Sequence, residues 1–283
     1  MLEAPTTGRL LADARLRLAA APFRPTGREA VLLMARALGC NEARVLAHPE
    51  DELDVETADR FREMLERRLS GEPVAYIFGE REFYGRLFAV DPRVLIPRPE
   101  TEHLVELALE LELPPQPVIL DLGTGSGCVA VTLACELPAA QLIATDVSHA
   151  ALAVARVNAR RHGVEHRVRL AAADLAQPLR LGGFDLVVSN PPYVGLDEAP
   201  LLSIDVRDHE PATAIFAPRT RLSIIERLTT ELGGLAPGTV VAFEIGAGRD
   251  DAVCELLPDS PLALVGVHAD YAGIPRVVVT KRR

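Results

Sequence analysis

Hydrophobic positions in the first quarter of the chain recur with the period of an α-helix. Three runs rich in Leu and Ala fall between Thr7 and Leu69, and Gly27, Gly39 and Pro49 separate them. Apolar residues three and four positions apart give each helix one buried stripe, and Gly and Pro interrupt helices. The pattern predicts a small helical bundle over residues 1–72.

The pattern changes over residues 73–96, where short β-prone segments replace the helical spacing. Glu82–Tyr84 and Leu87–Val90 flank Gly85-Arg86. A two-residue loop that begins with Gly is typical of a type II′ turn. We therefore predict a β-hairpin in a linker between two domains.

Strands and helices alternate over residues 97–283, which predicts an α/β domain with a mostly parallel sheet covered on both faces, a Rossmann-like arrangement. The last two strands have no helix between them and are expected to form an antiparallel hairpin at the sheet edge. The predicted strands are Val118–Leu122, Gln141–Asp146, Arg167–Ala171, Phe184–Ser189, Thr239–Ile245, Leu262–His268 and Arg276–Lys281. The predicted helices are Glu102–Leu111, Ser126–Leu137, Ala150–His162 and Leu222–Leu232.

A glycine-rich turn follows the first of these strands. Its sequence is Gly123-Thr124-Gly125-Ser126-Gly127, and ligands of open α/β sheets bind beyond the carboxyl ends of the strands. Cys128 stands where the dinucleotide fingerprint G-x-G-x-x-G has its last glycine, which disfavours an NAD(P)-binding oxidoreductase. Asp121 before the turn suits a cofactor with a cationic end, such as S-adenosylmethionine (SAM), better than a pyrophosphate.

Acidic residues follow the next two predicted strands. Asp146 lies where an acid accepts hydrogen bonds from ribose hydroxyls. A helix N-cap is the alternative role, which Ser148 could also fill. Asp174-Leu175 occupies the place that flanks the adenine in SAM-binding folds, although an ordinary loop aspartate is nearly as good an interpretation.

The candidate catalytic segment is Asn190-Pro191-Pro192-Tyr193, at the end of the fourth predicted strand. Proline fixes φ and restricts the residue before it, so this segment should form a stiff shelf. The Asn190 side-chain oxygen and the Pro191 carbonyl can accept N–H groups from a planar amide or amine, and Tyr193 can pack on its flat face. Positioning can supply about 7–11 kcal/mol of a barrier. The segment predicts methyl transfer to a planar nitrogen; a turn that merely closes the strand is the alternative.

Composition narrows the class of protein. The net charge is −10, with no long Lys/Arg run, which disfavours stable binding to nucleic acid. No apolar run is long enough to span a bilayer, and the N-terminus lacks the pattern of a secretory signal. The four cysteines are not spaced as zinc ligands or as a disulfide framework. We predict a cytoplasmic protein without a metal site.

Several segments carry a family resemblance. Asp121–Gly127 and Asn190–Tyr193 resemble SAM-dependent amino-methyltransferases. The match narrows to the HemK/PrmC family through Gly71–Ile77 with Gly79–Gly85, Leu95–Glu102, Asp205–Arg207, Glu210-Pro211 and Ala214–Phe216.

The resemblance implies a protein-(glutamine-N5) methyltransferase whose substrate is the glutamine of the GGQ motif in class I peptide chain release factors. It implies that the helical domain helps to recognise the release factor, and that Asn190–Tyr193 holds the glutamine. Arg98, Pro99 and Thr101 would line or brace that pocket, although Arg98 and Glu100 could instead form ion pairs at a helix start. SAM would be held by Gly123, Thr124, Gly125, Ser126, Gly127, Asp146, Asp174, Leu175 and Asn190.

The chain departs from the family pattern at two places. Ala217–Leu222, which includes Arg219-Thr220, replaces a Gly-rich or acidic turn, and Arg249-Asp250 stands where the family usually places a Gln. The nearest alternative function is a DNA or RNA adenine or cytosine amino-methyltransferase, which uses the same tetrapeptide after base flipping. The acidic charge disfavours it.

Overall fold

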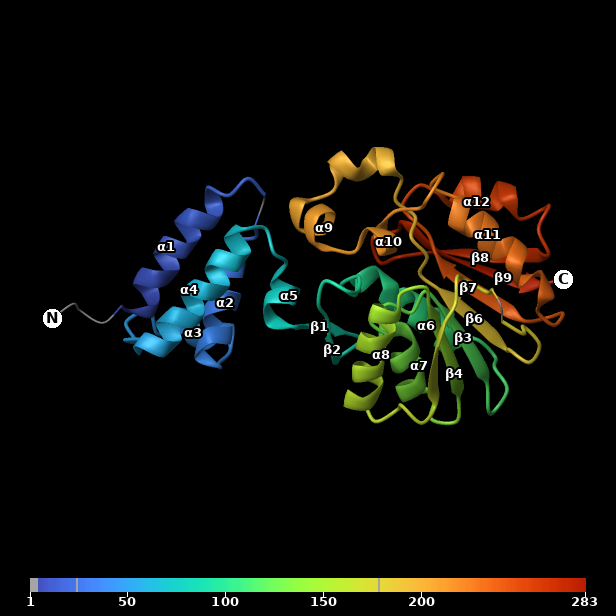
Figure 1. Cartoon of the computed structure of the whole chain (residues 1–283), viewed down its shortest axis with the longest axis horizontal. Coiled ribbons are helices and arrows are strands. Elements are labelled where there is room, and N and C mark those ends of the chain that lie inside the picture. The colour runs from blue at the N-terminus through green and yellow to red at the C-terminus, as the bar shows by residue number, and fades with distance from the viewer. Residues whose placement is uncertain (1–4, 24, 178) are drawn as a thin grey trace. The chain divides into compact units, whose positions relative to one another are not determined.

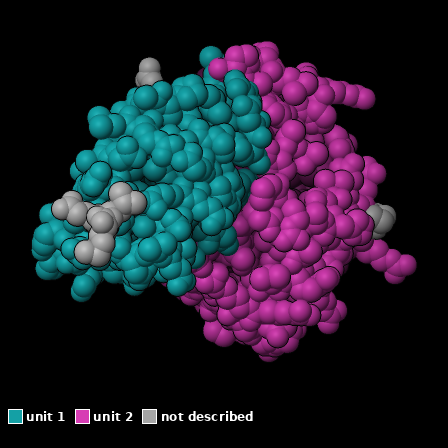
Figure 2. All heavy atoms as spheres, turned by 60° about the vertical axis from the view of Figure 1, so that its left-hand side comes forward, with its two compact units in different colours: residues 1–79, 201–209 teal, residues 80–200, 210–283 magenta. Residues whose placement is uncertain are grey.

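The structure is a computed structural model that describes residues 5–23, 25–177 and 179–283. The described residues form two compact units, coloured teal and magenta in Figure 2. The first unit comprises the chain up to Gly79 together with Leu201–His209, and the second comprises Glu80–Pro200 and Glu210–Arg283. The first unit is therefore discontinuous in sequence.

The first unit is helical, which confirms the prediction for the N-terminal region. Thr6, Asn41 and Asp54 each cap a helix by accepting a backbone N–H with the side chain, as their residue types favour. Buried apolar side chains at helical spacing, such as Phe61 and Leu65 at 0% and 1% exposure, form its core. The helices are α1 (Thr7–Ala19), α2 (Glu29–Leu38), α3 (Glu42–Ala47), α4 (Val55–Leu69), α5 (Val74–Phe78) and α9 (Ile204–His209).

Helices α3, α5 and α9 were not predicted. Helix α5 has five residues between Pro73 and the left-handed Gly79, which is too short for a helical period to show in the sequence. Helix α9 lies close to Gly71, because a Cβ atom there would lie 3.2 Å from both His209 Nε2 and Ile204 Cγ2.

A mostly parallel sheet forms the centre of the second unit, as predicted (Figure 1). Among the described residues it contains seven strands, in the order β5-β4-β3-β6-β7-β9-β8. Strand β9 is antiparallel to both β7 and β8, so the predicted antiparallel edge hairpin is confirmed. The strands are β3 (Val118–Leu122), β4 (Gln141–Asp146), β5 (Val168–Ala172), β6 (Leu186–Ser189), β7 (Val240–Glu244), β8 (Leu262–Ala269) and β9 (Pro275–Arg282).

Helices cover both faces of this sheet (Figure 1). Along β6, Leu186 and Val188 enter one core cluster and Val187 enters the other, as the two-residue period of a strand requires. Helices α6 (Glu102–Glu110), α7 (Cys128–Glu136) and α8 (His149–Arg161) pack on the first face, and α11 (Ser223–Glu231) and α12 (Asp250–Leu256) pack on the second. Shorter elements are η1 (Pro99–Thr101), η2 (Leu196–Leu201), α10 (Ala212–Ile215) and η3 (Leu232–Gly234).

The predicted hairpin is present, but its predicted turn was wrong. Strands β1 (Glu80–Phe83) and β2 (Arg86–Ala89) pair with Phe83 opposite Arg86, so the loop is Tyr84-Gly85 rather than Gly85-Arg86. Both loop residues have positive φ, 51° and 70°, as in a type I′ turn. Glycine thus occupies the second loop position, and Arg86 begins β2.

Candidate active site

The glycine-rich turn lies between β3 and α7 and has a left-handed backbone at alternate residues. The φ angles are 75° at Gly123, 55° at Gly125 and 81° at Gly127. A Cβ atom on Gly127 would lie 3.1 Å from that of Ala155, so glycine here also permits close packing against α8. The glycines therefore let the turn that follows β3 pack closely against α8.

The side chain of Asn158 on α8 holds the same turn through hydrogen bonds. This fully buried side chain donates to the Ser126 carbonyl at 2.8 Å and to the Ala89 carbonyl at 3.0 Å, and it accepts from Ala89 N at 2.7 Å. The amide therefore joins the turn to β2. Sequence reasoning did not identify Asn158, because a single Asn inside an amphipathic helix resembles a surface residue.

Asp146 at the end of β4 points its carboxylate at the turn. Oδ2 accepts from Gly125 N at 2.9 Å, and Oδ1 accepts from Ser148 N at 2.8 Å. Burial raises the pKa of this carboxyl group. Ser148 itself caps α8 through Ala151 N, so Asp146 is not needed as the N-cap residue.

A cavity opens beyond the carboxyl ends of β3, β4, β5 and β6. The structure brings several of the predicted site residues together there, although they come from separate parts of the chain. Those that line it are Gly123, Gly125, Asp146, Asp174, Leu175, Asn190 and Pro192. Asp174 is largely exposed and pairs with Arg227 at 3.1 Å. Leu175 has φ 54°, an uncommon left-handed backbone for a branched residue.

A smaller cavity adjoins the first, since Gly123, Gly125 and Asn190 line both. Asp121, at 2% exposure, also lines it, and burial raises the pKa of this carboxyl group to about 7. The buried Ser126 hydroxyl lines it too and has no hydrogen-bonding partner among the described residues.

These residues fit SAM. The acceptor Asp121 and the unused hydroxyl of Ser126 suit an amino-acid end that carries an ammonium group. The larger cavity, with Asp146, Asp174 and Leu175, suits a nucleoside end. Cofactor binding by these residues stays a prediction.

A chain of largely buried hydrogen bonds holds the candidate catalytic segment, Asn190–Tyr193. Asn190 Nδ2 donates to Thr101 Oγ1 at 2.9 Å, and Thr101 Oγ1 donates to Glu244 Oε2 at 2.7 Å. The Tyr193 hydroxyl donates to Glu244 Oε1 at 3.2 Å. The side chain of Asn190 is therefore oriented with its nitrogen toward Thr101, which directs its oxygen to the other side of the amide.

The buried carboxylate of Glu210 holds the segment before η1. Arg98 pairs with Glu210 Oε1 at 2.5 Å, and Ile96 N donates to Glu210 Oε2 at 3.0 Å. The Glu210 side chain is 1% exposed. The partner of Arg98 is thus a distant carboxylate rather than a residue at its own helix start.

Some predicted site residues lie outside these two cavities. Pro191, Tyr193, Pro99 and Gly127 are not among the lining residues, whereas Arg98, Thr101, Thr124 and Ser126 line the smaller cavity. The Tyr193 ring packs on Gly246, where a Cβ atom would lie 2.9 Å from Tyr193 Cδ2.

The two departures from the family pattern lie beside each other. Arg219-Thr220 and Arg249 line a separate open cavity together with Gly195. Arg249 Nη2 pairs with Glu198 Oε1 at 2.6 Å. These residues therefore do not line the two cavities of the candidate site.

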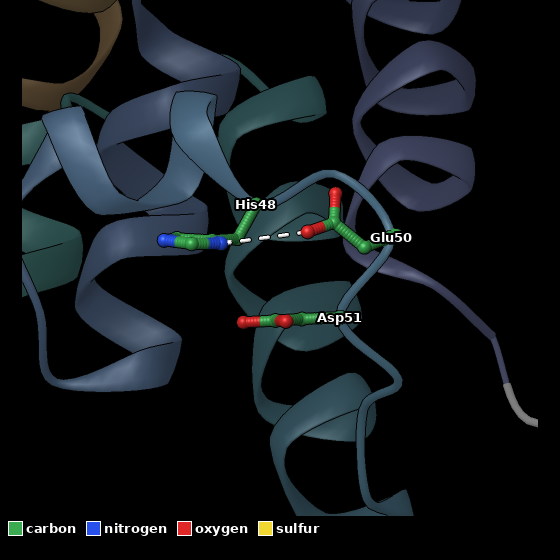
Figure 3. A group of neighbouring side chains, drawn as sticks. All are labelled: His48, Glu50 and Asp51. Atoms are coloured by element: carbon green, nitrogen blue, oxygen red, sulfur yellow. Dashed lines mark hydrogen bonds and ion pairs between the residues drawn. The ribbon is translucent and has the colours of Figure 1, made fainter.

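One group of side chains in the described part of the chain has the spacing of a metal site. His48, Glu50 and Asp51 are all exposed and belong to the first unit (Figure 3). His48 Nδ1 lies 3.4 Å from Glu50 Oε1, and Asp51 Oδ2 lies 3.8 Å from Arg44 Nη2. Exposed acidic groups of this kind are common without an ion, so the cluster does not indicate a metal centre.

Known proteins resemble this chain in sequence and in fold. Residues 9–79 match the PrmC N-terminal domain, and residues 101–201 match the methyltransferase small domain. A methyltransferase from Pyrococcus furiosus has the same fold, with a TM-score of 0.54 at 18% identity, over 77% of this chain and 98% of that one.

Curated relatives match over almost their whole length. A release factor glutamine methyltransferase of Koribacter versatilis is 43% identical, covering 95% of this chain and 96% of the relative. One of Nitratidesulfovibrio vulgaris is 40% identical, covering 96% and 94%. The chain is a SAM-dependent methyltransferase and belongs to the release factor glutamine methyltransferase family.

Proposed function

We propose that this enzyme transfers the methyl group of SAM to the side-chain amide nitrogen (N5) of the glutamine in the GGQ motif of class I peptide chain release factors. The observation that carries the proposal is the place of Asn190, which lines both cavities and whose amide nitrogen is fixed by Thr101. The names of the relatives favour a release factor as the substrate.

The chain's own groups account for how an amide nitrogen would be held. The Asn190 oxygen and the Pro191 carbonyl accept the two N–H bonds of the glutamine amide, which fixes the nitrogen and its lone pair. Burial raises the pKa of the Tyr193 phenol, so this hydroxyl stays protonated and donates to Glu244. Bound SAM supplies a methyl group already activated on a sulfonium, so positioning is the main task left to the protein.

The cofactor-binding roles belong to the same proposal. Asp146 accepts hydrogen bonds from the ribose, while Asp174 and Leu175 flank the adenine. The turn Gly123–Gly127 bends around the rest of SAM, with Asp121 near its ammonium group. The Asp146 carboxylate supports this assignment, because it lines the larger cavity and each of its oxygens accepts one backbone N–H and retains further acceptor capacity.

The proposal extends to the organisation of the chain. We assign residues 1–72 to release-factor recognition, 73–96 to a linker and 97–283 to catalysis, in an enzyme that works in the cytoplasm beside translation. In the part of the chain that the structure describes, every helix is too short or too polar to cross a bilayer. We expect no stable complex with nucleic acid.

The test is a methylation assay with labelled SAM and a purified class I release factor, followed by mass spectrometry of the modified peptide. We expect one added methyl group on the GGQ glutamine, and none on a release factor whose glutamine is replaced by alanine. Parallel reactions contain duplex DNA and RNA. Label in the nucleic acid, with an unmodified release factor, would refute the proposal in favour of a nucleic-acid methyltransferase.

A further inference from the structure

Glu244 is an ionisable residue in an otherwise apolar strand, and its surroundings are unusual. It ends β7, is 1% exposed, and both of its oxygens accept hydrogen bonds from hydroxyl groups. A buried carboxylate is costly unless it is fully hydrogen-bonded. The two hydroxyls belong to Thr101 and Tyr193, one of which bonds to the catalytic segment while the other is part of it.

The direction of these hydrogen bonds follows from counting protons. The single proton of the Thr101 hydroxyl is used toward Glu244, at 2.7 Å. Thr101 can then only accept from Asn190, so Asn190 must present its NH₂ group to Thr101. The Asn190 oxygen is consequently directed away from Thr101, which is the orientation that can accept an N–H of a substrate amide.

Protonation of Glu244 on Oε2, the oxygen that faces Thr101, would reverse this order. The Glu244 O–H would donate to Thr101, whose own proton would then need another acceptor in a buried site. The Asn190 oxygen satisfies that need when the amide turns over, and the Asn190 NH₂ group would then face the NH₂ group of the substrate. Two donors facing each other cannot form a hydrogen bond.

We propose that Glu244 is a positioning residue which, as a carboxylate, fixes the orientation of the Asn190 amide through Thr101 and of the Tyr193 ring through its hydroxyl. This inference rests on the proposed function for its kinetic test. In the roles assigned above, Glu244 contacts neither SAM nor glutamine. Its negative charge, rather than the shape of its side chain, is what positions the catalytic segment.

Charged groups around Glu244 set its ionisation. The pKa of Glu244 is raised to about 7 as the net result: burial, and to a smaller extent the charge of Glu100 of η1, raise it, while the bonds from Thr101 and Tyr193 and the charge of Arg276 on β9 lower it. Arg276 is itself paired with Asp270 at 3.0 Å. Two further groups interact electrostatically with this cluster: Cys128 on α7 with Glu244, and Arg98 with Tyr193.

The decisive variant is Glu244→Gln, which keeps the size of the side chain and removes its charge. The Gln side chain has one acceptor group, its oxygen, and one donor group, its NH₂, so its two ends cannot both accept a hydrogen bond from a hydroxyl. We expect kcat to fall about ten- to a hundredfold, the range for a hydrogen bond to a charged group, with SAM affinity retained. The wild-type kcat should decline below pH 7, and this decline should be smaller in the variant, in which Asp121 still titrates in this range.

Thr280→Val is the matched control for loss of a buried polar group. Thr280 is fully buried on β9 and donates to the Val241 carbonyl, outside the hydrogen-bond chain of Glu244. We expect it to lower thermal stability without changing the pH dependence of kcat. Thr101→Val tests whether Glu244 acts through Thr101. When it is combined with Glu244→Gln, the fold-decrease in kcat should be much smaller than the product of the two single decreases. Multiplicative effects would overturn action through Thr101.

A spectroscopic measurement separates this inference from the proposed function. The side-chain NH₂ signals of Asn190, followed by NMR in the protein alone, should shift between pH 6 and 8 in the wild type and not in Glu244→Gln. If the release factor is not methylated but the Asn190 signals still titrate, only the proposed substrate is refuted. A wild-type kcat and pH profile in Glu244→Gln, or Asn190 signals that do not titrate, would overturn the role of Glu244.

Discussion

Asn190 makes its structural contact with Thr101, on the side of its amide away from the predicted substrate. The bonds that hold the glycine-rich turn, from Gly125 N to Asp146 and from Asn158 to Ser126, do not involve it. Asn190→Ala should therefore bind SAM nearly as well as the wild type. Methyl transfer should fall by about two to three orders of magnitude, as when one positioned polar group is removed from an active site.

Two measurements check this prediction: calorimetric titration with SAM, and transfer of labelled methyl to the release factor. Loss of SAM binding in the variant would assign Asn190 mainly to the cofactor. Transfer at the wild-type rate would remove it from catalysis altogether.

Asp146 and Asp174 provide a matched pair of carboxylates in one cavity. Asp146 is half-buried and accepts from Gly125 N and Ser148 N, whereas Asp174 is exposed and paired with Arg227. Asp146→Asn should weaken SAM binding about ten- to a hundredfold, because bonds to a charged acceptor contribute about 1.5–3 kcal/mol. Asp174→Asn should weaken it less, since exposed ion pairs contribute about 0–1 kcal/mol. Equal losses in titration calorimetry would contradict the ranking.

The sequence identified Asp146 and Asn190 at the carboxyl ends of their strands, but it missed Glu244, which ends β7 and acts through distant residues. Asp146 and Asn190 could be predicted because the carboxyl ends of parallel strands share one edge of the sheet. Glu244 could not, because its partner Thr101 is 143 positions away in the chain. The one available signal was a carboxylate in an apolar strand, since a buried charge is rarely without a function or a partner.

Among the elements, the junction of β3 with α7 is tightly constrained. Gly127 combines a φ of 81° with a packing distance of 3.1 Å to Ala155, whereas Gly163 after α8 has a φ of 70° and open space around it. Gly163→Ala should cost only the left-handed backbone term, about 1–2 kcal/mol. Gly127→Ala should cost more, because Ala155 must also move. Urea unfolding followed by circular dichroism measures both, and equal costs would show that the packing adds nothing.

Element prediction succeeded where the periodic pattern was long or apolar. The bounds of β3 and β4 agree with the predicted ranges, and the other strands of the sheet differ by one or two residues at their ends. The predicted hairpin turn was misplaced by one residue, because a two-residue loop can have its glycine at the first or at the second position, and the sequence does not show which of the two Gly85 occupies. Helices α9 and α10 have six and four residues, which is less than two helical turns and leaves no period to detect.

On the scale of the whole molecule, two buried carboxyl groups make stability depend on pH near neutrality. The pKa values of Asp121 and Glu244 are both raised to about 7 by burial. A raised folded-state pKa stabilises the protein below the unfolded value, near pH 4, and this contribution is lost as the pH rises through about 7. Thermal unfolding without SAM should therefore show these two groups contributing less at pH 8.5 than at pH 5.5.

Asp121→Asn isolates one part of this effect. Its melting temperature should change less between the two pH values than that of the wild type, because the variant cannot ionise at this position. Burial lowers the pKa of His162, which acts in the opposite direction over the same range. The comparison between variant and wild type cancels that contribution, and an unchanged pH dependence would contradict a raised pKa at Asp121.

The discontinuous first unit has a consequence for biosynthesis. Its helices up to Gly79 leave the ribosome first, but α9, which lies against Gly71, ends at His209, and 209 − 79 is 130 residues later. At roughly 5–20 residues per second, this interval is about 6–26 s. Helix α9 contributes no buried residue to the core of the first unit, so α1 to α5 can pack before it is made, and the unit is completed only after β1 to β6 have emerged.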